Sequence, residues 1–116
     1  MSIGMAKLIT GGDGITPPFS VFLTPSLLAI DLPAGGGSAS SNLCSSNVTS
    51  GEEPFTYLWT LQSGPALTVN APTSANTFFS ASGFGGLIIS VYRCTVTDSL
   101  SAEVFSEVTI ETEGVN

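Results

Sequence analysis

The stretch Tyr92-Arg93-Cys94-Thr95-Val96-Thr97-Asp98 decides how the rest of the chain is interpreted, together with Trp59 and Cys44. Its alternation of apolar and polar residues is typical of a β-strand that buries one face. Tyr92, Cys94 and Val96 share that face. The tryptophan lies fifteen residues after the first cysteine, and the tyrosine two residues before the second. This spacing predicts two cysteines that face each other across a core, with the indole packed on the pair.

Such a spacing is the core signature of an immunoglobulin-like sandwich, in which the hydroxyl of Tyr92 ties the corner before its own strand to nearby backbone. Cys44 and Cys94 are then expected as a buried pair, either bridged by a disulfide or reduced, because cysteine behaves as a small buried hydrophobe in both cases. We expect neither a catalytic nor a metal-binding thiol, since the chain has no histidine and no C-x-x-C spacing.

Short apolar segments separated by Gly, Pro, Ser and Asn turns predict strands throughout the chain. The predicted strands cover residues 19–24, 28–32, 40–50, 55–62, 67–69, 77–81, 87–97 and 103–112. No helical period with caps runs over ten residues or more. We therefore predict an all-β fold, an immunoglobulin-like antiparallel β-sandwich of about seven to eight strands.

Two of the predicted strands have assigned faces. In the strand over 55–62, the aromatic residues and Leu61 share the face of Trp59. In the last strand, Val104, Val108 and Ile110 are expected to point inward, with Glu107 and Glu111 outward. Glu107 is expected to pair with Arg93 on the neighbouring strand, an exposed ion pair worth under about 1 kcal/mol.

Residues 1–18 are expected to form an extended N-terminal arm, residues 19–112 the sandwich and residues 113–116 a short C-terminal tail. Glycines and prolines deny the arm regular structure of any length. The arm nevertheless carries apolar residues that have no place in the sandwich pattern: Ile3, Met5, Leu8 and Ile9. They either dock on a neighbouring subunit or patch the protein's own sheet. An acidic sandwich with few apolar residues on its surface favours docking through the arm.

Composition excludes several classes of partner. Hydrophobic residues make up 42% of the chain and charged residues only 9%, so the surface is expected to be coated mainly with Ser, Thr, Asn and Gly. Two basic residues stand against nine acidic ones, for a net charge of −7. That charge disfavours nucleic acid and anionic membranes as partners. We expect no signal peptide, because the first residues lack a basic segment followed by an apolar one.

No set of residues forms a predicted active site. General acid–base catalysis usually uses histidine, which is absent, and no base is available to activate a serine. Asp13, and Asp98 with Glu103, are compatible with a weak calcium site, but we interpret them as turn residues. The prediction is therefore a chain that is not an enzyme and has no cofactor.

The segment Pro54-Phe55-Thr56-Tyr57-Leu58-Trp59 resembles the G-G-x-x-P-Y-x-Y-x-W stretch of PKD-like and Ig-like domains. The segments Pro72-Thr73-Ser74-Ala75, Thr77-Phe78 and 92–99 extend the resemblance to Ig-like modules carried by tail and head proteins of double-stranded DNA bacteriophages. The likeness covers residues 19–112. Glu52-Glu53 departs from the double glycine of that pattern, so the turn before Trp59 is expected to differ.

The resemblance implies a non-enzymatic structural protein of a tailed phage, and we expect a capsid decoration protein on the particle surface. The alternative is a tail-associated module, or an adhesion module that binds a carbohydrate or the host surface. The implied partners are the major capsid protein or another virion protein, and further copies of the chain. Its expected location is the virion surface, after synthesis in the host cytoplasm without a signal peptide. Loops poor in aromatic residues argue against a platform for stacking sugars.

Overall fold

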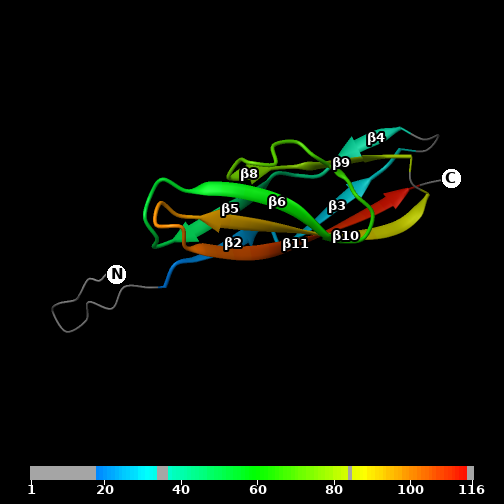
Figure 1. Ribbon diagram of the computed structural model, residues 1–116. Helices are drawn as coiled ribbons and strands as arrows, with labels where there is room; N and C mark the ends of the chain where they lie inside the picture. Colours follow the sequence, from blue (N-terminus) through cyan, green and yellow to red (C-terminus); the bar gives the residue numbers. More distant parts are fainter. Residues whose placement is uncertain (1–17, 34–36, 84, 115–116) are drawn as a thin grey trace.

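Ten strands make up the part of the chain that the computed structural model describes, residues 18–33, 37–83 and 85–114 (Figure 1). They are β2 (Ser20–Thr24), β3 (Leu27–Asp31), β4 (Ser38–Ser40), β5 (Cys44–Thr49), β6 (Thr56–Ser63), β7 (Thr68–Val69), β8 (Asn76–Thr77), β9 (Phe79–Ser82), β10 (Gly86–Thr97) and β11 (Glu103–Gly114). These residues contain no helix, so the predicted all-β class is confirmed.

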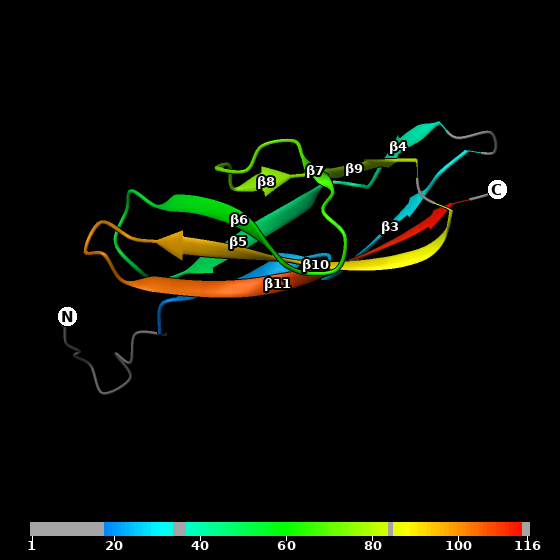
Figure 2. The same cartoon turned by 45° about the vertical axis from the view of Figure 1, so that its right-hand side comes forward.

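The strands form two layers. One layer is a four-stranded sheet in the order β3-β11-β10-β6. The other holds two three-stranded sheets, in the orders β2-β5-β8 and β4-β9-β7. Figure 2 shows β8 and β9 on one side of the long β10–β11 pair. All pairings are antiparallel except that of β11 with β3. This arrangement confirms the predicted immunoglobulin-like sandwich.

Two of the predicted strands are interrupted in the structure. The predicted strand over 40–50 is shortened to β5, which pairs with β2 and β8, and a break at residues 41–43 separates it from β4, which reaches only Ser40 of the predicted range and pairs with β9. The predicted strand over 77–81 divides at Phe78 into β8 and β9, which belong to different sheets. Ser41 bridges the two breaks, since its amide donates to the Phe79 carbonyl and its Oγ accepts from the Phe79 amide. The prediction of single strands was therefore wrong at both places.

The first strand changes sheets at the predicted break. β2 pairs with β5 in one layer, and after Pro25 the chain continues as β3, which pairs in parallel with β11 in the other layer. The Ser26 carbonyl accepts a hydrogen bond of 3.0 Å from the amide of Thr109, so the crossing itself is fastened to β11. β11 runs to Gly114, past its expected end at Thr112, because Glu113 still pairs with Asp31 and Leu87.

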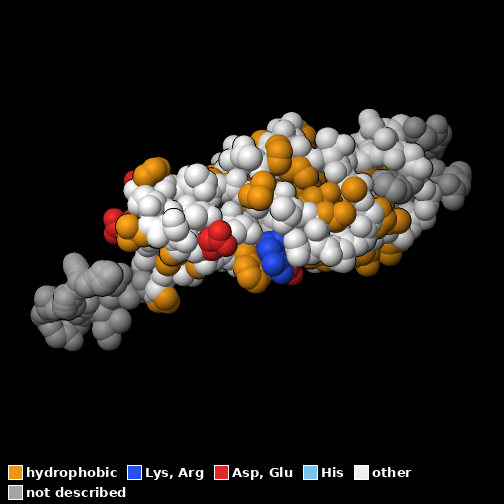
Figure 3. All heavy atoms as spheres, viewed as in Figure 1, with side chains coloured by type: hydrophobic (Ala, Val, Ile, Leu, Met, Phe, Trp, Pro, Cys, Tyr) orange, Lys and Arg blue, Asp and Glu red, His pale blue; other side chains and the backbone are white. Residues whose placement is uncertain are grey.

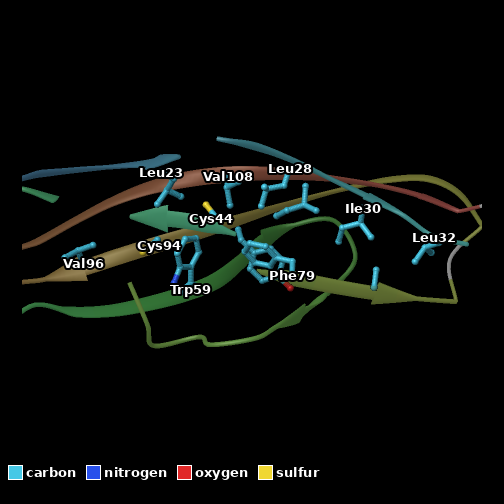
Figure 4. Packing of buried hydrophobic residues seen from close by; sticks show 13 residues of the cluster. Leu23, Leu28, Ile30, Leu32, Cys44, Trp59, Phe79, Cys94, Val96 and Val108 are labelled. Carbon is cyan, nitrogen blue, oxygen red and sulfur yellow. The ribbon is translucent and has the colours of Figure 1, made fainter. Parts of the chain in front are cut away.

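The core lies between the layers and is lined by alternate residues of the long strands (Figure 4). On β10 and β11 these include Tyr92, Cys94, Val96, Val108 and Ile110, all of which are buried. The opposite layer contributes Leu23, Cys44, Phe79 and Ala81, and β3 adds Leu28 and Ile30. The inward direction predicted for β10 and for the end of β11 is therefore confirmed.

Leu61 does not join this core. It shares the face of Trp59, as predicted, but its side chain is 39% exposed. The pairing of β6 with β10 shifts register between Tyr92, opposite Leu61, and Val91, opposite Ser63. The strict alternation of β6 ends at this irregularity, and β6 is an edge strand there. This irregularity leaves Leu61 exposed although it lies on the face of Trp59.

Gly64 makes the turn at the end of β6 possible. Its φ is +81°, a left-handed conformation that side chains with a Cβ rarely adopt. A Cβ at this position would lie 2.0 Å from the Ile89 carbonyl oxygen and 2.9 Å from the Cα of Ser90. The neighbouring Ser90 is fully buried and its Oγ donates to the Pro65 carbonyl at 2.6 Å. The turn is thus pressed directly against the backbone of β10.

We predict that Gly64→Ala lowers the free energy of unfolding by roughly 2 kcal/mol or more. The left-handed conformation alone costs a residue with a Cβ about 1–2 kcal/mol, and the clash with the backbone of β10 adds to that cost. Gly83→Ala is the matched control, since Gly83 has a φ of +77° and nothing within 4 Å of an added Cβ. Urea unfolding of both variants measures the difference. Equal losses of unfolding free energy would contradict the packing of this turn on β10.

Candidate docking surface

The two cysteines lie on facing layers, Cys44 on β5 and Cys94 on β10, and both are fully buried free thiols. Burial raises the pKa of Cys44 to about 11. Burial, with the nearby Cys44, raises the pKa of Cys94 to about 12. The Sγ of Cys44 donates to the Pro25 carbonyl at 3.5 Å. Thiols with pKa values this high hold almost no thiolate at neutral pH, so the pair is placed as core packing and not as a nucleophile.

Trp59 is buried beside the cysteines and fastens the loop between β7 and β8 (Figure 4). Its indole Nε1 donates to the Ser74 carbonyl at 2.8 Å, and its amide donates to the Pro72 carbonyl at 2.9 Å. The segment Pro72-Thr73-Ser74-Ala75 is therefore held on β6 through its backbone carbonyls. The Ala75 carbonyl in turn accepts from the amide and the Oγ of Ser46 on β5.

Tyr92 is buried and its hydroxyl binds backbone, but not at the corner before β10. The Oη of Tyr92 accepts from the Leu67 amide at 2.8 Å and donates to the Leu67 carbonyl at 3.1 Å. Leu67 lies between β6 and β7, twenty-five residues earlier. The expected corner contact was wrong. The segment 65–67 packs on β10, and the backbone amide and carbonyl of Leu67 both bind the Tyr92 hydroxyl.

Phe79 is the core residue that the sequence analysis missed. It is fully buried, with its ring edge-on to Trp59 at a centroid distance of 5.9 Å and tilted against Tyr92 at 4.9 Å. The one available signal was its alternation with Thr77 and Ala81, which are also buried. This signal is weak in the sequence, because the alternation covers three residues that belong to two different strands.

Asp98 is a turn residue in the structure. It is buried, and its carboxylate accepts backbone hydrogen bonds from Leu100, Ala102 and Glu52 at 3.0, 2.9 and 3.2 Å. Desolvation opposes its ionisation, but the three amides outweigh that effect and hold the pKa of Asp98 below its ordinary value. The bond to Glu52 joins the loop after β10 to the loop before β6. Both carboxylate oxygens are used in this way.

Across residues 18–33, 37–83 and 85–114, no group of His, Cys, Asp or Glu side chains gathers to hold a metal ion. Asp13 and the four arm residues Ile3, Met5, Leu8 and Ile9 lie outside the residues that the structure describes. No helix in the described part is long and apolar enough to cross a membrane.

Arg93 and Glu107 form the predicted ion pair on the outer face of the four-stranded sheet. The Arg93 Nη2 donates to the Glu107 Oε2 at 2.8 Å, and Nε donates to the same oxygen at 3.1 Å. The guanidinium also lies 3.8 Å from the centroid of the Phe105 ring. These contacts fix the one cation of the described residues over an exposed aromatic ring.

The outer face of this sheet is apolar on both sides of that ion pair. Towards the start of β6, Leu58 and Phe105 are exposed on either side of Thr95. In the other direction, Leu87, Ile89 and Leu27 are exposed along β10 and β3. Figure 3 shows a hydrophobic side chain next to the single basic side chain in view, and further hydrophobic side chains towards the right-hand end of the molecule. We call these five residues, with Arg93 and Glu107, the outer face.

This exposure corrects an expectation. The sandwich was expected to carry few apolar residues on its surface, yet nine large hydrophobic side chains of the described part are exposed. They are Phe22, Leu27, Leu43, Leu58, Leu61, Leu87, Ile89, Leu100 and Phe105. Five of the nine belong to the outer face, so more than half of them lie on one side of a single sheet.

A column of carboxylates borders the apolar residues. The outward positions of β11 are Glu103, Phe105, Glu107, Thr109, Glu111 and Glu113, and Asp31 of β3 pairs beside the last of them. Among the described residues, Arg93 with Glu107 is the one ion pair. The outer face therefore offers apolar area on β10 next to negative charge on β11, which suits a partner that is both apolar and basic.

Known structures share this sandwich. The chain is similar to the solution structure of the PKD domain of human KIAA0319, with a TM-score of 0.57 and 16% identity over 96% of this chain and 95% of that one. It is also similar to a nucleoside hydrolase-related hypothetical protein from Saccharophagus degradans associated with carbohydrate metabolism, with a TM-score of 0.55 and 9% identity. That match covers 90% of this chain and 27% of the other. The chain thus has a PKD-like, immunoglobulin-like fold.

No family model and no curated protein sequence matches the chain. The similarity is therefore one of fold, at identities of 16% and 9%. A fold of this kind hosts many unrelated functions, so it is the residues of this chain that indicate its function.

We predict that Asp98→Asn lowers the melting temperature at pH 7, because Asn keeps one oxygen acceptor but presents an amide N–H₂ to a backbone amide. The depressed pKa of Asp98 means that the carboxylate stabilises the fold above its ordinary pKa of about 3.9 and that this contribution is lost as pH falls through the folded-state value. The gap between wild type and variant should therefore shrink below about pH 4.

Thermal unfolding followed by circular dichroism from pH 7 to pH 2 measures that gap. Glu103→Gln, which removes an exposed carboxylate at the start of β11, is the control and should leave the melting temperature at pH 7 unchanged. A gap that stays constant over the whole range would show that the Asp98 charge does not hold the two loops together.

Proposed function

We propose that the chain is a non-enzymatic structural protein of a tailed-phage particle, a capsid decoration protein that attaches to the particle surface through its outer face. The observation that carries the proposal is the exposed apolar stripe of that face, bordered by the acidic column of β11. The sequence resemblance to Ig-like modules of phage head and tail proteins supports the kind of assembly. The proposed partner is the major capsid protein or another virion protein.

The residues fit binding better than catalysis. The chain contains no histidine, and the carboxylate of the buried Asp98 already accepts hydrogen bonds from three backbone amides. The thiols are buried, and their raised pKa values leave them protonated at neutral pH. The glutamates of β11 stand exposed in a row on the strand surface, where solvent stabilises their charge. These side chains supply recognition, not a general acid or base.

The energy available from the outer face suits a contact repeated over a large assembly. Leu27, Leu58, Leu87, Ile89 and Phe105 are each about half exposed, so burying them contributes roughly 4–7 kcal/mol in total. Association costs about 4–15 kcal/mol in lost freedom of motion, so the outer face alone gives weak binding. The apolar residues of the arm, Ile3, Met5, Leu8 and Ile9, are proposed to add the remaining contact in the assembled particle.

Phe105→Glu tests the proposal against Phe22→Glu as a matched control. The two rings are 56% and 57% exposed, but Phe22 lies on β2 in the opposite layer. Particles are produced in cells that supply each variant, and mass spectrometry of purified particles counts the copies of the chain. We predict that Phe105→Glu lowers the copy number at least tenfold while Phe22→Glu leaves it near wild type. Equal incorporation of both variants would overturn the outer face as the attachment surface.

The second candidate is the adhesion module that binds a carbohydrate or the host surface, and the exposure of Phe22 favours it. This ring stands at the centre of the strand β2, flanked by Ser20 and Thr24 and paired with Asn47 of β5. An exposed ring among hydroxyl and amide groups is chemically suited to a sugar. Loss of host binding in Phe22→Glu, with normal incorporation of Phe105→Glu, would support this candidate instead.

A further inference from the structure

We infer that residues 3–9 of the arm bind the outer face of their own molecule, where they lie against β10 and place Lys7 next to the carboxylates of β11. This inference does not depend on which partner the outer face meets in an assembly. It concerns the free protein and the chain segment that covers an apolar patch before any partner arrives.

The outer face needs a cover in the free protein. Leu87 and Ile89 are 61% and 49% exposed on adjacent outward positions of β10, and Leu27 is 56% exposed two strands away. Clustered apolar side chains of this kind mark binding surfaces and promote aggregation when they are left open. Glu113 and Glu111 of β11 lie directly opposite Leu87 and Ile89, yet both apolar side chains remain exposed.

The arm matches the outer face in chemistry. Lys7 is the one lysine of the chain, and Met5 and Leu8 stand on either side of it with Ile3 and Ile9 beyond. Arg93 is engaged with Glu107, so Glu111 and Glu113 have no cationic partner among the described residues. A segment with one positive charge inside an apolar run complements an apolar strand that runs beside a negative one.

The arm also has the length to reach. Phe19 stacks on Phe55 at a centroid distance of 6.0 Å, just before β6 begins, so the chain enters the sandwich at the end where β10 finishes and β11 starts. From there the row of Arg93 and Glu107 lies about 13 Å along the strands, and the layers are about 10 Å apart. The nine residues between Ile9 and Phe19 can span up to about 30 Å, which exceeds the sum of these two distances. Six strand residues, about 20 Å, separate Arg93 from Leu87, and the seven residues 3–9 can span up to about 23 Å.

Binding within one molecule is favoured over exchange between molecules. A short linker that spans the two sites it joins sets an effective concentration in the millimolar range. At micromolar protein the arm of a second copy is therefore outcompeted by roughly a thousandfold. The contact is accordingly weak and reversible, and a partner that binds the outer face more tightly displaces the arm and frees its apolar residues.

Carbodiimide cross-linking of the full chain at micromolar concentration tests this contact, because the reagent joins an amine to a carboxylate only when the two touch. We predict that chymotryptic peptides of the monomeric product contain Lys7 joined to Glu107, Glu111 or Glu113. Lys7→Arg removes this product while it keeps the charge. Leu87→Glu with Ile89→Glu should lower its yield at least fivefold, whereas Phe22→Glu should leave the yield unchanged.

Three results would overturn the inference. They are Lys7 cross-links that appear only in dimers, Lys7 cross-links confined to Glu52 and Glu53 beside the point where the arm joins the sandwich, and a yield that does not respond to the changes on β10. The first assigns the arm to a second copy. The other two describe a tethered arm that has no binding site. None of these results depends on particle incorporation, so this test and that of the proposed function fail separately.

Discussion

The structure depends on the way Trp59 joins the two layers. Its ring meets Phe79 of the opposite layer edge-on, and its indole N–H and backbone N–H are both bound by the loop 72–74. Buried indole and amide donors are costly when they lack an acceptor, so the loop has to stay on β6 as long as the tryptophan stays in the core. Tyr92 does the same for the segment at Leu67. Two aromatic residues thereby hold the irregular chain between β6 and β8.

This interior leaves the outer surfaces free for binding. The core residues come from the inward positions of the strands, apart from Leu32 just after β3. The irregular turns are fastened from inside by Trp59, Tyr92, Ser90 and Asp98. The outward positions of β10 and β11 neither line the core nor fasten a turn. Exposed leucine, isoleucine and phenylalanine there weaken solubility without improving the core, which is why we assign them to binding.

Much of the fold could be predicted because its strongest signals are local. The alternation of Tyr92, Cys94 and Val96 in β10, the break at Pro25 and the pairing of Arg93 with Glu107 all follow from spacing along one or two strands. The break of the predicted strand over 77–81 at Phe78 could not be seen, because it depends on which sheet each half joins. The contact of Tyr92 with Leu67 has the same origin, since twenty-five residues separate the two.

The candidate surface was harder to predict than the fold. Leu87-Ile88-Ile89 is a continuous apolar run, and such a run is usually interpreted as a fully buried strand. In the structure only one of its faces is covered, and Leu87 and Ile89 point outward. Neighbouring outward positions come from β3, β6 and β11, which are far apart in sequence, so the outer face exists only once the sheet is assembled.

Hydrogen exchange of the Trp59 indole N–H, followed by NMR at increasing urea, tests the central role of this residue most directly. If the indole holds the layers and the loop 72–74 together, its proton exchanges only through global unfolding, and its opening free energy equals that of the whole domain and falls with urea at the same slope. Exchange through a smaller opening that is insensitive to urea would contradict the account, because the loop would then leave Trp59 while the sandwich remains folded.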